Sequence, residues 1–190
     1  MKKTIFIIFF LLILLSCSSE KSHNNPTIYV TITPLKALIE EITCGDFNID
    51  VVVPEGASPE SFEPTARHIS AMSDAELVFE VGLINFEQSL VKHLGDNLVN
   101  LSNGIEPMAG SCSHAHHHGH HHSHGIDPHI WTAPRTLRTM VENAREAILA
   151  QYPDSAKYER AAQALLERID GIDRRCAERI KASDVHTMMI

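Results

Sequence analysis

Apolar residues in the first half of the chain form short runs that alternate with stretches of helical spacing. Four runs rich in Ile, Val, Leu and Phe predict buried strands at residues 28–32, 47–53, 76–81 and 98–101. Apolar positions three or four residues apart predict helices between these runs, at residues 34–44, 66–72 and 86–94. Strands that alternate with helices favour an α/β fold, with a parallel sheet flanked by helices on both faces.

Turn residues mark where these elements begin and end. Thr33 is predicted to cap the first helix, with Pro34 at its first position and Gly45 just past its end. Pro54-Glu55-Gly56 closes the second strand, and a loop over residues 57–64 follows. Because ligands of parallel sheets bind beyond the carboxyl ends of the strands, this loop is a candidate part of a binding site.

The second half of the chain is predicted to be mainly helical. Pro134 opens a helix whose apolar face consists of Leu137, Met140, Val141, Ala144 and Ile148. A longer helix follows from Asp154, with a stripe formed by Tyr158, Ala162, Leu165, Ile169, Ile172, Cys176 and Ile180. At about 1.5 Å per residue this helix extends for about 40 Å, so we expect it to connect two bodies rather than to pair in a coiled coil.

Composition narrows the classes of function. Charged residues make up 21% and apolar residues 44% of the 190 residues, as is ordinary for a globular protein. The net charge is -8 with histidine counted as neutral, and the sequence has no cluster of Lys and Arg that could follow a phosphate backbone. We therefore expect no nucleic-acid partner, and the acidic balance suits a protein that binds cations.

The N-terminus has the pattern of a secretion signal. Lys2 and Lys3 precede an apolar run over residues 5–15, which is too short to span a bilayer as a helix. The run leads into Leu14-Leu15-Ser16-Cys17, which resembles the lipobox of bacterial lipoproteins, although a cysteine buried in a core helix is the alternative. With Cys17 lipidated, we expect an extracytoplasmic protein that is tethered to a membrane, in the periplasm or at the cell surface.

These signals divide the chain into five segments. They are a signal peptide, a flexible tether, an N-terminal lobe, a long connecting helix and the first strand of a second α/β lobe, expected at residues 1–17, 18–26, 27–153, 154–182 and 183–190. We expect this second lobe to continue beyond Ile190. Apart from Cys17 the chain has Cys44, Cys112 and Cys176, and an odd number predicts no disulfide framework.

A histidine-rich stretch lies inside the N-terminal lobe, at residues 112–125. Its small polar spacers cannot build a core, so we expect a mobile loop. With an ordinary pKa of about 6.5, imidazoles are mostly neutral near pH 7 and can bind a transition metal. A spacer without function and an expression tag are the alternatives. The candidate auxiliary ligands are His114, His116, His117, His118, His120, His121, His122 and His124.

Asp127-Pro128-His129-Ile130-Trp131 directly follows the stretch and has different properties. Pro128 restricts its own backbone and that of Asp127, while Ile130 and Trp131 supply bulk that is expected to be buried. A histidine held in such a segment has a defined position. His129 is therefore a candidate for a fixed metal ligand, although a lone histidine in a turn is more often structural.

Taken in order, these motifs resemble the metal-binding lipoproteins that serve ABC importers for zinc and manganese, and above all the zinc branch. The resemblance rests on residues 53–64, on Val81-Gly82-Leu83, on the histidine-rich insertion and on residues 127–131. It implies two α/β lobes joined by a long helix, with the metal between them. It also implies an ABC importer permease as the partner, and we expect a monomer.

The resemblance also implies a ligand set. The family binds its metal through a histidine of the first loop, a histidine of the Asp-Pro-His unit, and a histidine and an acidic residue of the second lobe. His129 matches the second of these ligands, and Glu60 stands where the first histidine is usual. Glutamate also binds zinc, through oxygen. His68 is a less favoured substitute for the first ligand, and the other two ligands are expected beyond Ile190.

The expected function is a high-affinity Zn²⁺ receptor that is not an enzyme. A manganese or iron receptor of the same family is the nearest alternative, favoured by the harder ligand Glu60. A stand-alone periplasmic metal buffer or sensor is the next. A metallohydrolase would need an open coordination position and a general base, and the sequence contains no His-Glu-x-x-His unit.

Overall fold

A computed structural model describes residues 25–108 and 126–183. Its sheet has four strands in the order β2-β1-β3-β4, and every neighbouring pair is parallel. The strands are β1 (Thr27–Val30), β2 (Asn48–Val51), β3 (Leu77–Glu80) and β4 (Leu98–Asn100). This topology confirms the predicted parallel α/β sheet, and each strand falls within or beside its predicted run.

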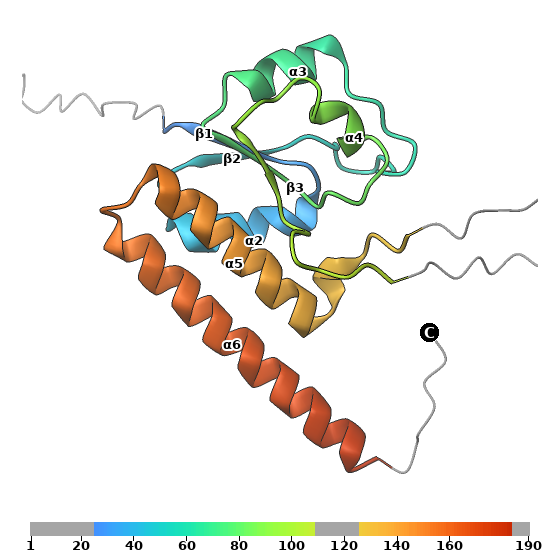
Figure 1. Ribbon diagram of the computed structural model, residues 1–190, viewed down its shortest axis with the longest axis vertical. Helices are drawn as coiled ribbons and strands as arrows, with labels where there is room; N and C mark the ends of the chain where they lie inside the picture. The colour runs from blue at the N-terminus through green and yellow to red at the C-terminus, as the bar shows by residue number, and fades with distance from the viewer. Residues whose placement is uncertain (1–24, 109–125, 184–190) are drawn as a thin grey trace, which may run out of the picture.

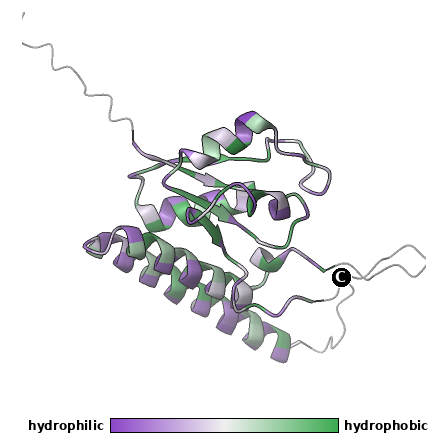
Figure 2. Cartoon of the chain, turned by 45° about the horizontal axis from the view of Figure 1, so that its top comes forward, coloured by the Kyte–Doolittle hydropathy of each residue, from purple (hydrophilic) through white to green (hydrophobic). Residues whose placement is uncertain are grey.

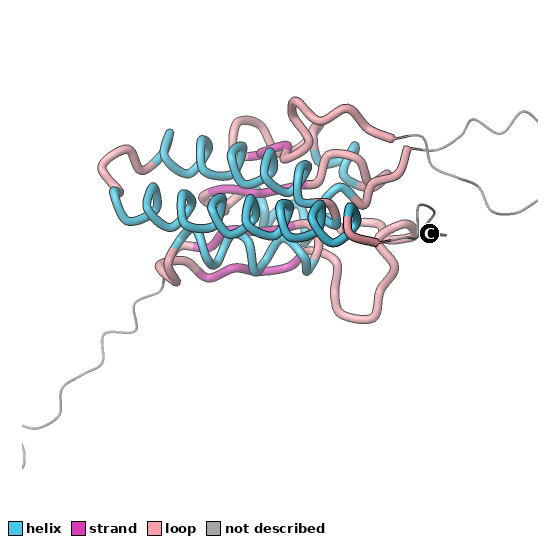
Figure 3. The backbone as a smooth tube through the Cα atoms, turned by 90° about the horizontal axis from the view of Figure 1, so that it is seen from below, coloured by secondary structure: helices cyan, strands magenta, loops and turns pink. Residues whose placement is uncertain are grey.

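Helices cover both faces of the sheet (Figure 1). One face carries α3 (Ala66–Ser73) and α4 (Glu87–Leu90), and the other carries α2 (Thr33–Thr43) and α5 (Pro134–Gln151). The helix α6 (Ala156–Lys181) lies outside α2 and runs beside α5 (Figure 3). A single 3₁₀ turn, η1 (Ile130–Thr132), precedes α5.

Two predicted helix boundaries are wrong in detail. Ile32, not Thr33, occupies the N-cap of α2, and it makes no side-chain cap bond. At the other end the prediction is confirmed: Cys44 is the C-cap with φ 55°, and Gly45, with φ 76°, lies just past the end of the helix. The predicted helix 86–94 is also shorter, because beyond Leu90 the chain continues in turns, with the His93 amide bonded to the Leu90 carbonyl.

The core lies between the sheet and its helices, and the apolar positions gather there (Figure 2). Strand residues Ile28, Val30 and Phe79 are fully buried. The predicted inner faces of the helices are buried with them, including Leu35, Ile39, Met140, Ala144 and Ile148. Burial of one such aliphatic side chain contributes roughly 1.5–3 kcal/mol, so this core holds the strand ends in place.

The long helix α6 confirms the helix predicted from Asp154, and its two halves differ. Residues of the first half are buried against α5 and α2: Tyr158, Ala162, Leu165, Leu166 and Ile169. In the second half Ile172 is 43% exposed and Ile180 57% exposed. The predicted role of α6 as a connection stays a prediction, because the strand expected at 183–190 lies, except for Ser183, outside the described residues.

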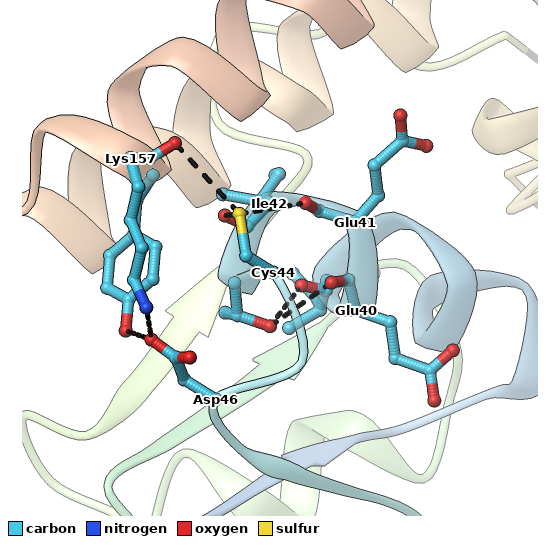
Figure 4. A network of polar contacts seen from close by, with 9 residues as sticks. Glu40, Glu41, Ile42, Cys44, Asp46 and Lys157 are labelled. Carbon is cyan, nitrogen blue, oxygen red and sulfur yellow. Dashed lines mark hydrogen bonds and ion pairs between the residues drawn. The ribbon is translucent and has the colours of Figure 1, made fainter.

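A polar network joins the end of α2 to the start of α6 (Figure 4). The Asp46 carboxylate pairs with Lys157 and accepts a 2.6 Å hydrogen bond from the Tyr158 hydroxyl. These two contacts, first Lys157 and then Tyr158, lower the pKa of Asp46. Further along, Arg168 donates to Glu41 at 2.7 Å. The network fixes where α6 leaves the lobe.

Several predicted segments lie outside the described residues. They include the signal peptide with Cys17 and most of the tether, and also the histidine-rich stretch with Cys112. Within residues 25–108 and 126–183, no helix combines the length and the hydrophobicity that a membrane span requires.

Candidate metal cleft

A cleft of about 380 Å³ opens at the carboxyl ends of the strands. Its lining comes from the residues that follow three strands, Ile32-Thr33-Pro34 after β1, residues 53–60 after β2 and Ile84 after β3, together with Pro128, His129 and Trp131. Strand β1 pairs with β2 on one side and with β3 on the other, so the strand order changes direction at β1. The cleft therefore lies where ligands bind in open parallel sheets.

The loop after β2 is shaped by two consecutive turns. The Ala57 amide donates to the Pro54 carbonyl at 3.1 Å, and Gly56 between them has φ 81°, a conformation that glycine adopts without strain. The Ser61 amide then donates to the Ser58 carbonyl at 3.2 Å. Pro59 and Glu60 form the corner of this second turn. The Glu60 side chain is exposed at the cleft.

Aromatic packing anchors the loop beyond Glu60. The ring of Phe62 packs edge-on against Phe86 at 5.2 Å and stacks on His68 at 5.6 Å. The Nδ1 atom of His68 accepts a 3.2 Å hydrogen bond from the Thr65 amide, and the Thr65 hydroxyl accepts from the His68 amide. His68 thus belongs to the N-terminal capping box of α3. It does not line the cleft, which disfavours it as a substitute for Glu60.

A local turn holds His129, which lines the cleft from a segment that is far from Glu60 in the sequence. Asp127 Oδ1 accepts a hydrogen bond from the His129 amide at 2.9 Å and lies 2.7 Å from the ring atom Nδ1. Both contacts, the amide first, lower the pKa of Asp127 and keep it ionised. A hydrogen on Nδ1 leaves the Nε2 lone pair available for a metal, as in the carboxylate–histidine pairs of metal sites.

The two apolar residues after His129 have different environments. Ile130 is 8% exposed, as predicted. Trp131 is only half-buried, because its indole lines the cleft and lies 5.1 Å from the His129 ring. The prediction that both residues are buried is therefore wrong for Trp131. Since it is the one tryptophan of the 190-residue sequence, its fluorescence reports on the cleft.

Glu60 and His129 are the two predicted ligands that the structure brings to one cleft. Among the described residues, no group of three or more His, Cys, Asp and Glu side chains has the geometry to hold a metal ion. The predicted auxiliary ligands His114 to His124 lie outside the described residues. The residues that flank this stretch are described: the Asp127 amide donates to the Met108 carbonyl at 3.0 Å, so the chain on either side of the stretch comes together beside His129.

Sequence reasoning missed three acidic residues at this edge of the sheet. Asp127 was recognised only as a neighbour of Pro128, although an Asp two residues before a histidine is a signal for a local turn. Glu80 and Glu87 are buried, at 3% and 1% exposure, and were not predicted to have a role. The signal for Glu80 was a carboxylate inside a run expected to be a buried strand.

A comparison with known protein families agrees with the motif order and the cleft. The sequence profile of one family, ZnuA, described as "Zinc-uptake complex component A periplasmic", matches residues 28–189. The chain belongs to the ZnuA family. This confirms the resemblance on which the sequence prediction relied.

Individual relatives of the ZnuA family are similar at a lower level. The zinc-binding lipoprotein AdcA of Streptococcus pneumoniae is 28% identical over 185 residues, covering 88% of this chain and 35% of AdcA. The high-affinity zinc uptake system protein ZnuA of Bacillus subtilis is 29% identical over 167 residues, covering 83% of this chain and 52% of the relative. The chain thus spans about a third to a half of their lengths.

Solved structures of similar proteins support the fold. The metal-dependent lipoprotein YcdH of Bacillus subtilis superposes with a TM-score of 0.71 at 24% identity, covering 84% of this chain and 57% of that one. At this level of identity the likeness establishes the fold and leaves the ligands to be argued from the residues themselves.

Proposed function

We propose that this chain contributes the N-terminal half of a Zn²⁺-binding site in an extracytoplasmic receptor that delivers the ion to an ABC importer. The observation that carries the proposal is the shared cleft, in which the exposed Glu60 carboxylate and the Asp127-oriented His129 imidazole both form part of the lining. Two ligands leave a tetrahedral zinc ion two further positions. Residues outside the described part of the chain would supply them.

The ligand types and the histidine-rich stretch together favour zinc over manganese. An imidazole suits zinc, whereas the Glu60 oxygen also suits manganese. The histidine-rich stretch favours zinc, because its eight histidines lie in the sequence between Met108 and Asp127, and these two residues contact each other next to His129. Several weak sites on one tether raise the local ion concentration at the cleft. We propose that residues 112–125 act as this collector.

The membrane arrangement is part of the same proposal. A lipid on Cys17 would hold the lobe at a membrane surface within reach of the permease. Closed coordination by protein side chains would leave no open position for catalysis, so the protein acts as a receptor rather than an enzyme. We propose that it works as a monomer. The ion is cargo, held through the His129 imidazole and the Glu60 carboxylate.

Chelator-competition titrations with Zn²⁺ test the proposal. His129→Ala is expected to remove the tight binding class and to leave weak binding, and deletion of residues 113–125 is expected to do the reverse. His93→Ala is the matched control, because His93 is an exposed histidine away from the cleft. Equal loss of binding in the His93 and His129 variants would contradict the assignment.

Proton competition supplies an independent test. A bound imidazole must be neutral, so zinc affinity should fall between about pH 7.5 and about pH 5.5. An affinity that does not change over this range would rule out imidazole ligands in both the cleft and the histidine-rich stretch.

A further inference from the structure

A buried carboxylate lies at the same edge of the sheet as the cleft and takes no part in its lining. Glu87, the first residue of α4, is 1% exposed, and each of its oxygens accepts two hydrogen bonds. Oε1 accepts from the Thr31 hydroxyl at 2.6 Å and the Val81 amide at 2.9 Å. Oε2 accepts from the Gly82 amide at 2.8 Å and the Ile84 amide at 3.0 Å.

Each of these donors belongs to a segment that leads into the cleft. Thr31 follows β1 and directly precedes Ile32, the first lining residue from that strand. Residues 81–84 follow β3, and Ile84 itself lines the cleft. Gly82 is needed for this arrangement, since it has φ 84° and a Cβ atom there would lie 2.2 Å from the Asn100 side chain. One carboxylate therefore joins the ends of two neighbouring strands.

A second buried carboxyl group faces the same region. Val30 pairs with Phe79, so the next residues, Thr31 and Glu80, emerge on one face of the sheet. Glu80 is 3% exposed, and its Oε2 atom has no hydrogen-bond partner among the described residues. In residues 25–108 and 126–183, no Lys, Arg or His forms an ion pair with Glu80 or Glu87.

Two ionised carboxylates cannot share this environment at low cost, so one of them keeps a proton. Glu87 is the ionised group, because four donors point at it. Burial still raises its pKa, and these hydrogen bonds oppose that effect. For Glu80, burial and then the charge of Glu87 raise the pKa to about 8. Glu80 is therefore a neutral acid at pH 7.

We propose that Glu87 is a positioning residue for the metal cleft, holding the ends of β1 and β3 in the conformation that lines it. This inference rests on the proposed function, because it assigns Glu87 a role in shaping the same site. Glu87 does not contact the ion. It acts through Ile32 and Ile84, and loss of the Glu80 proton places a second negative charge next to it and loosens the two strand ends.

A pH titration of the metal-free chain tests the pairing of the two carboxyl groups. Trp131 fluorescence is expected to change with a midpoint near pH 8 in the wild type, and to show no such change in Glu80→Gln, which mimics the neutral acid. In Glu87→Gln the midpoint should move to lower pH, because the neighbouring charge that holds the Glu80 proton is gone. A midpoint that stays at the wild-type pH in Glu87→Gln would overturn the pairing of the two carboxyl groups.

Zinc titrations at pH 7 test the positioning role. Thr31→Val removes one of the four donors to Glu87, and Glu87→Gln replaces an acceptor oxygen with a donor. Both are expected to weaken Zn²⁺ binding, Glu87→Gln by about tenfold, as is common for residues that support metal ligands. Glu80→Gln should bind Zn²⁺ like the wild type at pH 7 and keep its affinity at higher pH.

The outcomes separate the two hypotheses. If the wild type does not bind Zn²⁺ in the cleft, the proposed function fails, and the Trp131 titration still decides whether the carboxyl pair controls the strand ends. If Thr31→Val binds Zn²⁺ as tightly as the wild type, or if Glu80→Gln keeps the wild-type pH profile, the positioning role is wrong. These two variants decide the question even if Glu87→Gln does not fold.

Discussion

Two pairs of polar groups lie at the same edge of the sheet and differ in how their bonding capacity is used. Glu60 and His129 are exposed, and His129 uses one ring nitrogen for Asp127. Glu80 and Glu87 are buried, and Glu87 uses both oxygens for four donors of its own chain. The exposed pair has lone pairs left to offer an ion, whereas in the buried pair Glu87 holds the surrounding backbone. Residue type alone does not distinguish a ligand from a support.

The largest difference between the two pairs should appear in stability. Glu87→Ala leaves three amides and one hydroxyl buried without an acceptor, so we expect it to lower the free energy of unfolding by about 3 kcal/mol. Glu60→Ala should change it by less than about 0.5 kcal/mol, because Glu60 is exposed. Urea unfolding at neutral pH measures both variants. Equal unfolding midpoints would show that Glu87 is not the support that its contacts indicate.

The pH dependence of stability should reveal the proton on Glu80. Its pKa in the folded chain is about 8, above the ordinary value of 4.5, so the native state keeps a proton that the unfolded state releases. The stability that this proton contributes is complete below about pH 4.5 and is lost as the pH rises through about 8. Glu80→Gln removes this dependence. We expect the variant to be more stable than the wild type near pH 7.5, by an amount that falls toward zero near pH 4.5.

Denaturant unfolding at several pH values measures this difference. Glu76→Gln is a suitable control, because Glu76 lies one residue before the start of the same strand and is exposed. A constant difference between Glu80→Gln and the wild type at all pH values would mean that folding does not shift the pKa of Glu80.

The metal preference of the exposed pair, Glu60 and His129, can be shifted toward zinc. Glu60→His restores the histidine that the family resemblance leads one to expect, and it replaces a hard oxygen ligand by an imidazole. We expect the preference for Zn²⁺ over Mn²⁺ to rise by about tenfold, as measured by competition between the two ions. Glu63→His is the control, because Glu63 is exposed in the same loop and does not line the cleft. If the control gives the same increase, Glu60 is not a ligand.

The smallest effect is expected at the partner of His129. Asp127→Asn keeps the shape of the turn and removes the charge that favours a hydrogen on Nδ1. We expect Zn²⁺ affinity to fall by about fivefold at neutral pH, near the low end for supporting residues, because Asp127 is partly exposed. An unchanged affinity would indicate that the turn alone orients the ring.

Local patterns were sufficient for most of the elements. The helix α5 begins at Pro134 as predicted and buries the predicted face, since its spacing and its first-turn proline act over one or two turns. The N-cap of α2 was mispredicted. The Thr31 amide bonds to the Phe79 carbonyl and the backbone is still extended at Ile32, so Ile32 becomes the N-cap and Thr33 the first helical residue. Contacts between distant segments override a local preference.

By itself the sequence determined the parallel α/β class, the candidate ligand His129 and the family, because spacing, turn residues and motifs are properties of neighbouring positions. Glu60 became a candidate only through the family resemblance. Only the tertiary structure decided that Glu60 and His129 line one cleft, that Trp131 stays half-buried beside them, and that Glu87 is bonded to Thr31, 56 positions away along the chain. The physical reason is that parallel strands bring their carboxyl ends to one edge. Burial and hydrogen bonding there depend on segments that no local window contains.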